Sequence, residues 1–210
     1  MKRVYWLIVG LIVLALGFYL LGCGASGGNA TTTTTQEDQP IGGFTFTSIT
    51  FDSGGAIPTA NAYTAITDGQ NHSPHLTWSP ASSPDVLSIE SYVLTMVDTT
   101  LSAASGEDIY HWVVIDISDD DTIIAARASQ STGNYNTLSS GTELTNSFDR
   151  VGYEGPWPDE EHTYTFKIYA LNVASIDLAA DTRMTQALFD AQVTEAKIVQ
   201  SKTLTGTFTP

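Results

Sequence analysis

The chain has 210 residues, 42% of them hydrophobic, which is enough for one domain of ordinary size with its own core. It carries a formal net charge of −15, from 23 acidic and 8 basic residues. A chain of this composition offers no basic patch to a phosphate backbone or to an anionic lipid surface. Nucleic acid and a purely electrostatic membrane contact are therefore excluded as expected partners.

The first 22 residues have the pattern of an export signal. Lys2 and Arg3 precede an apolar run that ends in the tetrapeptide Leu-Leu-Gly-Cys, with Cys23 last. This ending resembles the lipobox of bacterial lipoproteins, so we expect cleavage before Cys23 and acylation of its sulfur, which would anchor the exported protein to a bacterial cell membrane. The alternative is an uncleaved signal anchor, because the run is about long enough to span a bilayer. Cys23 is the only cysteine, so no disulfide forms within the chain.

Residues 23–40 follow as a predicted tether. They are rich in Gly, Thr and Ser and, beyond Cys23, contain no large apolar side chain, so they have nothing to bury in a core. We therefore expect the globular domain to span residues 41–210.

Within this domain, alternating apolar and polar residues predict strands separated by turn-forming clusters. The expected strands are residues 44–51, 73–78, 88–98, 109–117, 162–171 and 202–208. One helical window, 181–201, places four apolar residues on one side: Met184, Leu188, Ala191 and Ile198. The pattern predicts an all-β fold, an antiparallel β-sandwich with a late C-terminal helix.

Four polar side chains fall at the ends of otherwise apolar strand faces. Strict alternation puts His111 in phase with Val113 and Ile115, and puts His162 and Tyr164 in phase with Phe166. Asp98 ends the preceding strand, so it would lie at the same end of the sheet as His111. A buried His or Tyr is more often satisfied by backbone groups, and a strand-end Asp often caps a turn. Convergence of all four favours a small-ligand pocket.

The segment "VGYEGPWPDEEHTYTF" (151–166) places a rigid turn directly before two of these side chains. Gly152 and Gly155 would let the backbone approach a ligand closely, and Pro156 and Pro158 would restrict its conformations. We expect backbone N–H groups of this turn to point at a bound anion.

Five segments, in order, resemble the motifs of the phosphatidylethanolamine-binding protein family, in its bacterial Raf-kinase-inhibitor-like branch. They are "NHSPHLTW", "VLTMVDTT", "YHWVVIDI", "VGYEGPWPDEEHTYTFKIYAL" and "KTLTGTF". The resemblance covers about residues 44–208 and implies a β-sandwich with a shallow anion pocket. The pocket residues that it implies are Asp98, His111, Gly155, Pro156, His162 and Tyr164.

The sequence departs from the family pattern at two motifs. The family's Asp-Pro-Asp reads Asp98-Thr99-Thr100 here, and its His-Arg-Tyr motif has Thr163 in the middle position. Half of the acidic pair is thus replaced, which bears on the ligand more than on the fold.

The resulting expectation is a non-catalytic, membrane-anchored binding module for a small anionic or phosphorylated group, without a cofactor and with its protein partner unidentified. One alternative is a hydrolase that uses the same His and Asp residues. No Gly-x-Ser-x-Gly motif is present, but Thr99 and Thr100 adjoin Asp98. Another is a structural or interaction protein whose pocket is disused.

Metal binding is not expected. His72 and His75 are three residues apart but lie beside a proline in a loop-like segment, without further ligands nearby. The three aspartates 119–121 lack the glycine spacing of a calcium loop.

Overall fold

A computed structural model describes residues 43–80, 88–133 and 135–210. The expected export signal, Cys23 and the tether lie outside the described residues, as do the first two residues of the expected domain. Among the residues that the structure does describe, no helix is both long enough and apolar enough to cross a membrane.

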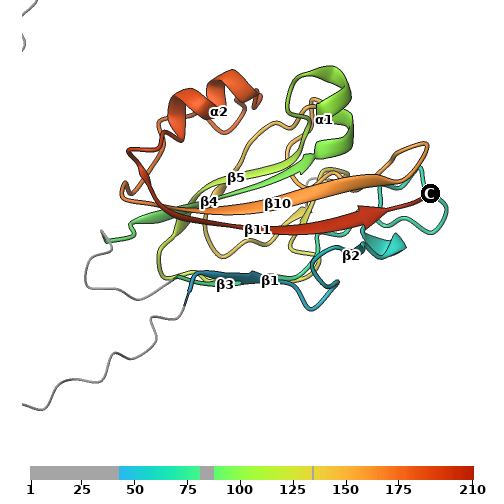
Figure 1. Cartoon of the computed structure of the whole chain (residues 1–210), viewed down its shortest axis with the longest axis horizontal. Helices are drawn as coiled ribbons and strands as arrows, with labels where there is room; N and C mark the ends of the chain where they lie inside the picture. The colour runs from blue at the N-terminus through green and yellow to red at the C-terminus, as the bar shows by residue number, and fades with distance from the viewer. Residues whose placement is uncertain (1–42, 81–87, 134) are drawn as a thin grey trace, which may run out of the picture. The chain divides into compact units, whose positions relative to one another are not determined.

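The described chain is built from a six-stranded sheet, a three-stranded sheet, a two-stranded sheet of β7 and β8, and two short α-helices (Figure 1). The larger sheet has the order β2-β11-β10-β4-β5-β9, and the smaller has the order β1-β3-β6. The bounds of the larger sheet are β2 Gly55–Ala56, β4 Ser91–Asp98, β5 Tyr110–Ser118, β9 Thr142–Glu143, β10 His162–Leu171 and β11 Ile198–Phe208. The other elements are β1 Thr45–Thr47, η1 Thr59–Asn61, β3 Leu76–Ser79, α1 Thr99–Ser105, β6 Ile123–Ile124, β7 Ser129–Gln130, β8 Tyr135–Asn136 and α2 Gln186–Gln192.

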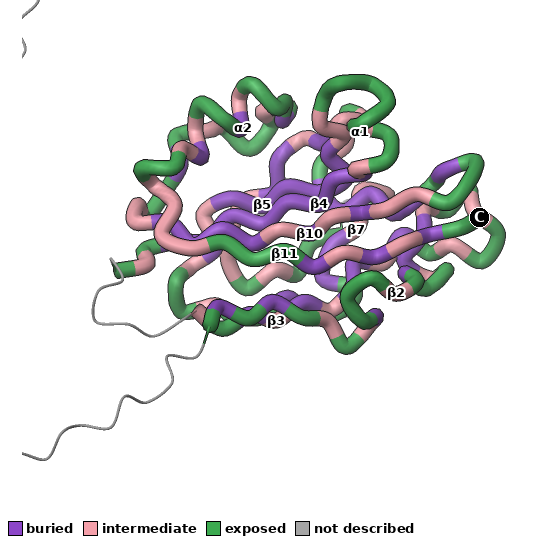
Figure 2. The backbone as a smooth tube through the Cα atoms, in the orientation of Figure 1, coloured by how far each residue is buried: buried purple, intermediate pink, exposed green. Residues whose placement is uncertain are grey.

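The elements form three layers, with the helices on one side of the larger sheet and the three-stranded sheet on the other (Figure 1). Side chains alternate along the central strands. On β4, Leu94 and Met96 face the smaller sheet, whereas Val93 and Val97 face α2. The central strand β4 is buried along its whole length, whereas α1 has no buried residue (Figure 2). The expected β-sandwich with a late helix is confirmed.

The late helix is shorter than the pattern predicted. Only α2, Gln186–Gln192, is helical, and Ile198 begins β11 instead. β11 pairs antiparallel with β10 over its whole length, so inter-strand hydrogen bonding overrides the helical periodicity of this segment. Ala191, expected on the buried side, is exposed, and Phe189 and Val193 carry the packing.

Strand β5 is interrupted by a bulge at His111. Met96 pairs with Trp112 and Val97 pairs with Tyr110, so His111 is an extra residue on β5. The expected alternation is therefore wrong at this point: Val113 and Ile115 pack on the α2 side, while His111 lies on the other face, against Tyr164.

Candidate functional site

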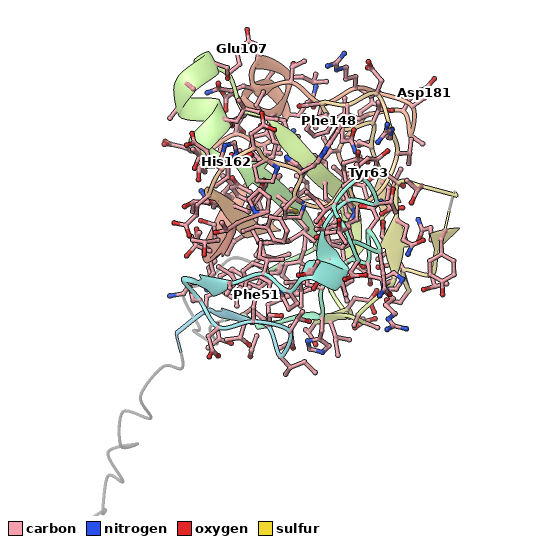
Figure 3. All side chains as sticks on the ribbon, turned by 90° about the vertical axis from the view of Figure 1, so that its right-hand side faces the viewer. Phe51, Tyr63, Glu107, Phe148, His162 and Asp181 are labelled. Atoms are coloured by element: carbon pink, nitrogen blue, oxygen red, sulfur yellow. The ribbon has the colours of Figure 1, made fainter. Side chains whose placement is uncertain are left out.

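A small pocket lies at the end of the larger sheet where β4 stops and β10 begins. Its volume is about 60 Å³. Ten residues line it: Asp98, Leu101, His111, Phe148, Glu154, Gly155, Trp157, Pro158, His162 and Tyr164. Figure 3 looks onto this end of the molecule, with His162 and Phe148 labelled. Five of the six residues expected to bind an anion are thus brought together, Pro156 being the exception.

Asp98 has two partners, one for each carboxylate oxygen. Oδ1 accepts a hydrogen bond from the Leu101 N–H (2.8 Å) and so caps α1, while Oδ2 lies 2.6 Å from Nδ1 of His162. Tyr164 is paired with Asp98 in the β10–β4 register, which explains why these residues share one end of the sheet. Asp98 therefore both caps α1 and lines the pocket.

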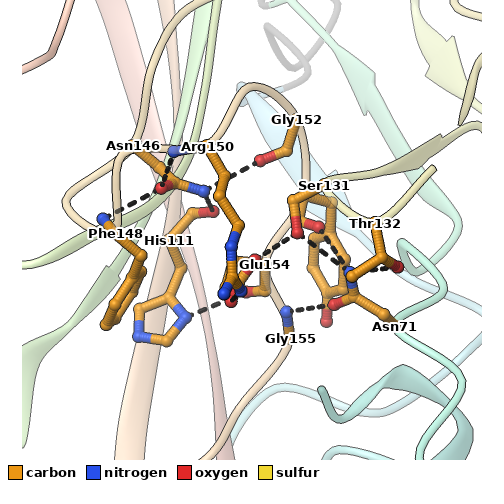
Figure 4. A network of polar contacts seen from close by, with 11 residues as sticks. Asn71, His111, Ser131, Thr132, Asn146, Phe148, Arg150, Gly152, Glu154 and Gly155 are labelled. Carbon is orange, nitrogen blue, oxygen red and sulfur yellow. Dashed lines mark hydrogen bonds and ion pairs between the residues drawn. The ribbon is translucent and has the colours of Figure 1, made fainter. Parts of the chain in front are cut away.

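His111 is buried, and its ring is held by the backbone. Its Nδ1 lies 2.9 Å from the Glu154 carbonyl oxygen (Figure 4). Edge contacts with Phe148 and Tyr164 fix the ring plane, at centroid distances of 4.8 and 5.2 Å. Burial lowers the pKa of His111, although the Glu154 carbonyl and the charge of Asp98 act in the opposite direction. The neutral imidazole is therefore favoured.

The Tyr164 hydroxyl is buried and has no hydrogen-bond partner within the described chain. Burial raises the pKa of Tyr164, and the negative charge of Asp98 raises it further. The phenol is thus a neutral donor that lies near the Asp98 carboxylate but forms no well-oriented hydrogen bond with it. Because buried polar groups are nearly always paired in native proteins, this hydroxyl is the strongest mark of a ligand site here.

The wall of the pocket is a network of paired polar groups, shown in Figure 4. The buried Glu154 carboxylate contacts Arg150 and accepts a hydrogen bond from Ser131. The Asn71 side chain accepts from the Gly155 N–H (2.7 Å) and donates to Ser131 (3.0 Å). Burial raises the pKa of Glu154, while Ser131 and Arg150 lower it.

The turn at Gly155 has a different role from the expected one. The Gly155 N–H is bonded to Asn71 and does not face the pocket as a free donor. A Cβ on Gly155 would lie 2.1 Å from the Asn61 carbonyl oxygen, so glycine is needed for close packing of two backbone segments. Gly152 has φ +97° and packs near Ser129, and its carbonyl accepts from Asn146.

Pro156 does not line the pocket. Its carbonyl oxygen accepts a hydrogen bond from the Tyr63 N–H (3.0 Å), which ties the turn to the segment after η1. The expectation that the turn presents backbone donors to an anion is therefore wrong for the N–H groups of Glu154 and Gly155, which bond His111 O and Asn71 Oδ1.

The two threonines that replace part of the acidic motif are the first residues of α1. The Thr99 hydroxyl donates to the Thr163 carbonyl (2.9 Å), and the Thr163 N–H donates to the Thr100 hydroxyl (2.9 Å). Neither threonine lines the pocket. They fasten α1 to the start of β10, which keeps Asp98 beside His162.

No group of three or more potential metal ligands occurs in the described ranges. His72 and His75 lie outside the pocket, and each has a buried Nδ1 that lacks a hydrogen-bond partner among the residues described.

Sequence reasoning missed several residues that build the site. Phe148 and Trp157 line the pocket but follow no strand pattern, and Glu154 and Asn71 form its wall. Asn71 and Glu154 both occur in the quoted family-like segments. The available signal for Glu154 was an acidic residue inside the turn that Gly152, Gly155 and Pro156 restrict.

Comparisons with known proteins show which family the domain belongs to. The model of the family described as phosphatidylethanolamine-binding protein matches residues 47–209. LppC of Mycobacterium tuberculosis, named as a candidate lipoprotein, is 31% identical over 209 residues, which cover 90% of each chain. The UPF0098 protein YbhB of Escherichia coli is 30% identical over 115 residues, which cover 53% of this chain and 66% of YbhB.

The fold also has solved counterparts. The crystal structure of Escherichia coli YbcL, described as a member of the mammalian PEBP family, aligns with a TM-score of 0.65 at 24% identity, over 80% of this chain and 98% of YbcL. The family model spans most of the domain, and the LppC match extends over most of both chains. This chain belongs to the phosphatidylethanolamine-binding protein family.

Proposed function

We propose that this protein is an exported, lipid-anchored binding module whose pocket holds a small phosphoryl group without turning it over. The observation that carries the proposal is the buried, unpartnered hydroxyl of Tyr164 beside two imidazoles. An oxygen-rich ligand would satisfy that hydroxyl, and the pocket has no other evident purpose in the packing.

The size of the pocket supports a group as small as phosphate. A cavity needs roughly 10–15 Å³ to hold one water molecule. The volume of about 60 Å³ is several times that minimum, so the pocket can admit a group larger than one water molecule but not a bulky ligand. Larger parts of a ligand would extend past Leu101 and Trp157, both exposed at the rim.

The charge of the pocket supports binding through local hydrogen bonds. Its lining includes the acids Asp98 and Glu154 but neither a lysine nor an arginine. Asp98 is engaged by His162 and Leu101, and Glu154 by Arg150 and Ser131, so both carboxylates have partners within the chain. An anion would be held by hydrogen bonds from the Tyr164 hydroxyl and the His162 ring, because the lining provides no positively charged Lys or Arg.

The hydrolase alternative has one observation in its favour, the Asp98–His162 pair, which resembles a base held by an orienting carboxylate. It lacks a nucleophile: the Thr99 and Thr100 hydroxyls are bonded to the backbone of β10. Binding without turnover is therefore the better supported function.

Inorganic phosphate, titrated while the imidazole NMR signals are followed, tests the proposal. We expect the signals of His111 and His162 to shift saturably and those of His72 and His75 to stay nearly still. Shifts confined to His72 and His75 would contradict the site. Saturable hydrolysis of a phosphate or carboxylate ester that disappears in His162→Ala would establish an enzyme instead.

The anchor is tested separately. The match to LppC and the sequence around Cys23 support an acylated cysteine. We expect wild-type protein in the membrane fraction and Cys23→Ser protein outside it, with intact mass reporting the acyl chains. A mass that retains Met1 or an unmodified Cys23 would contradict the anchor.

A further inference from the structure

A second pocket lies toward the other end of β5 from His111. Its volume is about 220 Å³, and it forms where the end of β5 meets β6 and the segment 137–140. Ile117, which lines it, is six residues beyond His111, so the two pockets are separated by about 20 Å along the strand. They share no lining residue.

The inside of this second pocket is apolar. Its aliphatic lining residues are Ile117, Ile123, Ile124, Ala125, Ala128 and Leu138. Ile123 is 51% exposed, although covering such a side chain is favourable. An engineered aliphatic cavity of about 150 Å³ binds benzene. A pocket of this size and lining therefore suits one aromatic ring or a short alkyl group.

Hydrogen bonds hold the walls of the second pocket in place. The Thr137 N–H donates to the Ala128 carbonyl (2.8 Å), and the Ala128 N–H donates to the Ala125 carbonyl (3.2 Å). The Ser118 N–H donates to the Ser140 hydroxyl (2.8 Å), which ties the opposite wall to the end of β5. Because the walls are already connected, a ligand would need to order little of the chain.

Acidic side chains stand at the rim of the second pocket. The Oδ2 atom of Asp121 accepts hydrogen bonds from the hydroxyls of Ser139 (2.8 Å) and Ser140, which both line the pocket. Asp119 and Asp120 precede Asp121 in an exposed turn. None of the three aspartates forms an ion pair with a residue that the structure describes. The lining contains neither lysine nor arginine.

We propose that the second pocket binds a small hydrophobic amine in its ammonium form, with the apolar body of the ligand against Ile123 and Leu138 and the ammonium group beside Asp121. The Oδ1 atom of Asp121 accepts no hydrogen bond from a described residue, so it is open to an N–H donor. The acidic rim and the formal net charge of −15 favour a cation over a neutral or anionic ligand of the same shape. This site is independent of the pocket at His162.

Benzylamine, benzyl alcohol and benzoate are probes of about the same size that differ in charge. Each is titrated at pH 7 into the whole protein while the isoleucine methyl NMR signals are followed. We expect saturable shifts at Ile117, Ile123 and Ile124, with Ile57 and Ile168, which lie outside this pocket, nearly unchanged. Benzylamine should bind about 2- to 5-fold more tightly than benzyl alcohol, as expected for a partly exposed ion pair, and benzoate should bind most weakly. The preference for the amine should shrink in about 1 M salt.

Asp121→Asn isolates the contribution of the charge, because asparagine keeps an oxygen for the two serine hydroxyls. Benzylamine should then bind no more tightly than benzyl alcohol, whose own affinity should not change. Asp52→Asn removes an exposed charge that is not part of this pocket, so it should keep the preference for the amine. A preference that survives in Asp121→Asn would contradict the assignment of Asp121.

Ala125→Phe tests the position of the site. Ala125 is exposed and lines the pocket, so a phenyl ring at this position can fill the space without displacing a buried side chain. The saturable shifts should disappear in this variant and persist in Ala126→Phe, because Ala126 is exposed but does not line the pocket. If Ala125→Phe does not fold, the titrations of the wild-type protein still decide the matter.

Two results with the wild-type protein would overturn the proposal. Equal affinities for benzylamine and benzyl alcohol would exclude the ammonium group as the recognised feature. Methyl signals of Ile117, Ile123 and Ile124 that do not shift, or benzylamine shifts at the imidazoles of His111 and His162 instead, would exclude the site. Neither result involves phosphate, so the proposed function would stand.

Discussion

The pocket and its wall use the same kinds of buried polar side chain with opposite results. In the wall, Asn71, Glu154 and Ser131 pair with one another and with the backbone, so their hydrogen bonds are internal. In the pocket, the buried Tyr164 hydroxyl has no internal hydrogen-bond partner in the described chain. A buried polar group with a hydrogen-bond partner inside the protein stabilises the fold. A buried polar group without such a partner indicates a site where a ligand can bind.

Gly155→Ala should have the largest effect, because it breaks the wall through its backbone. The added Cβ would lie 2.1 Å from the Asn61 carbonyl oxygen and 2.7 Å from the Tyr63 nitrogen, and backbone atoms cannot yield cheaply. We expect a loss of about 3 kcal/mol or more, or a fall in Tm of at least about 6 °C, by thermal unfolding. Gly43→Ala is the control, since nothing lies within 4 Å of its Cβ position.

Asn71→Ala should have the second largest effect on stability. It removes the acceptor of the Gly155 N–H and a donor to Ser131, leaving buried groups unpaired. We expect about 1–3 kcal/mol of destabilisation in denaturant titrations. Asn172→Ala, which loses an exposed hydrogen bond to Ala196, should cost much less. Equal losses would mean that the wall is not the stabilising network described above.

A pair of tyrosine substitutions makes the sharpest comparison of pocket and wall. Tyr153 and Tyr164 are both fully buried, but the Tyr153 hydroxyl donates to the Asn61 carbonyl (2.8 Å). Tyr153→Phe should cost about 1 kcal/mol or more, whereas Tyr164→Phe should leave stability unchanged or raise it. Phosphate affinity should respond in reverse, weakening about 2- to 150-fold only in Tyr164→Phe. A destabilised Tyr164→Phe protein would show that its hydroxyl is satisfied internally.

The smallest effect concerns pH and Glu143, a buried acid bonded to Trp112 and Ser129 away from the pocket. Burial raises the pKa of Glu143, although the two hydrogen bonds lower it. The folded state therefore binds more protons than the unfolded state between the ordinary glutamate pKa and the raised one. Stability from this residue is present at low pH and declines as pH rises through that window.

Glu143→Gln keeps an oxygen for Trp112 and removes the ionisation. In unfolding experiments from pH 4 to pH 8, we expect the variant to gain on the wild type as pH rises. A variant that loses ground with rising pH would show that ionised Glu143 is stabilised by its partners.

The main strands and three of the pocket residues could be predicted from sequence, because alternation is a local property. Asp98, His162 and Tyr164 follow the pattern without correction, and their proximity is fixed by the β10–β4 register. His111 reaches the pocket for a different reason, since a bulge places it against the phase of Val113 and Ile115. Nothing in the sequence of β5 marks that bulge.

The wall could not be foreseen for a related reason. Asn71 and Gly155 are 84 positions apart, and their hydrogen bond depends on how two loops pack. The glycine was expected to favour ligand approach, yet it accommodates the Asn61 backbone. The predicted helix at 181–201 is too long because the end of this segment pairs with β10. The hydrogen bonds to that distant strand prevail over the local helical periodicity of the sequence.

His111, the bulged residue of β5, makes two hydrogen bonds to the loop that contains Glu154. Its carbonyl oxygen accepts from the Glu154 N–H (3.0 Å), and its ring Nδ1 donates to the Glu154 carbonyl (2.9 Å). The main chain and the side chain of His111 thus bind the two peptide groups that flank the Cα of Glu154. The ring of His111, which lines the pocket, is therefore bonded directly to the turn that also carries the exposed Trp157.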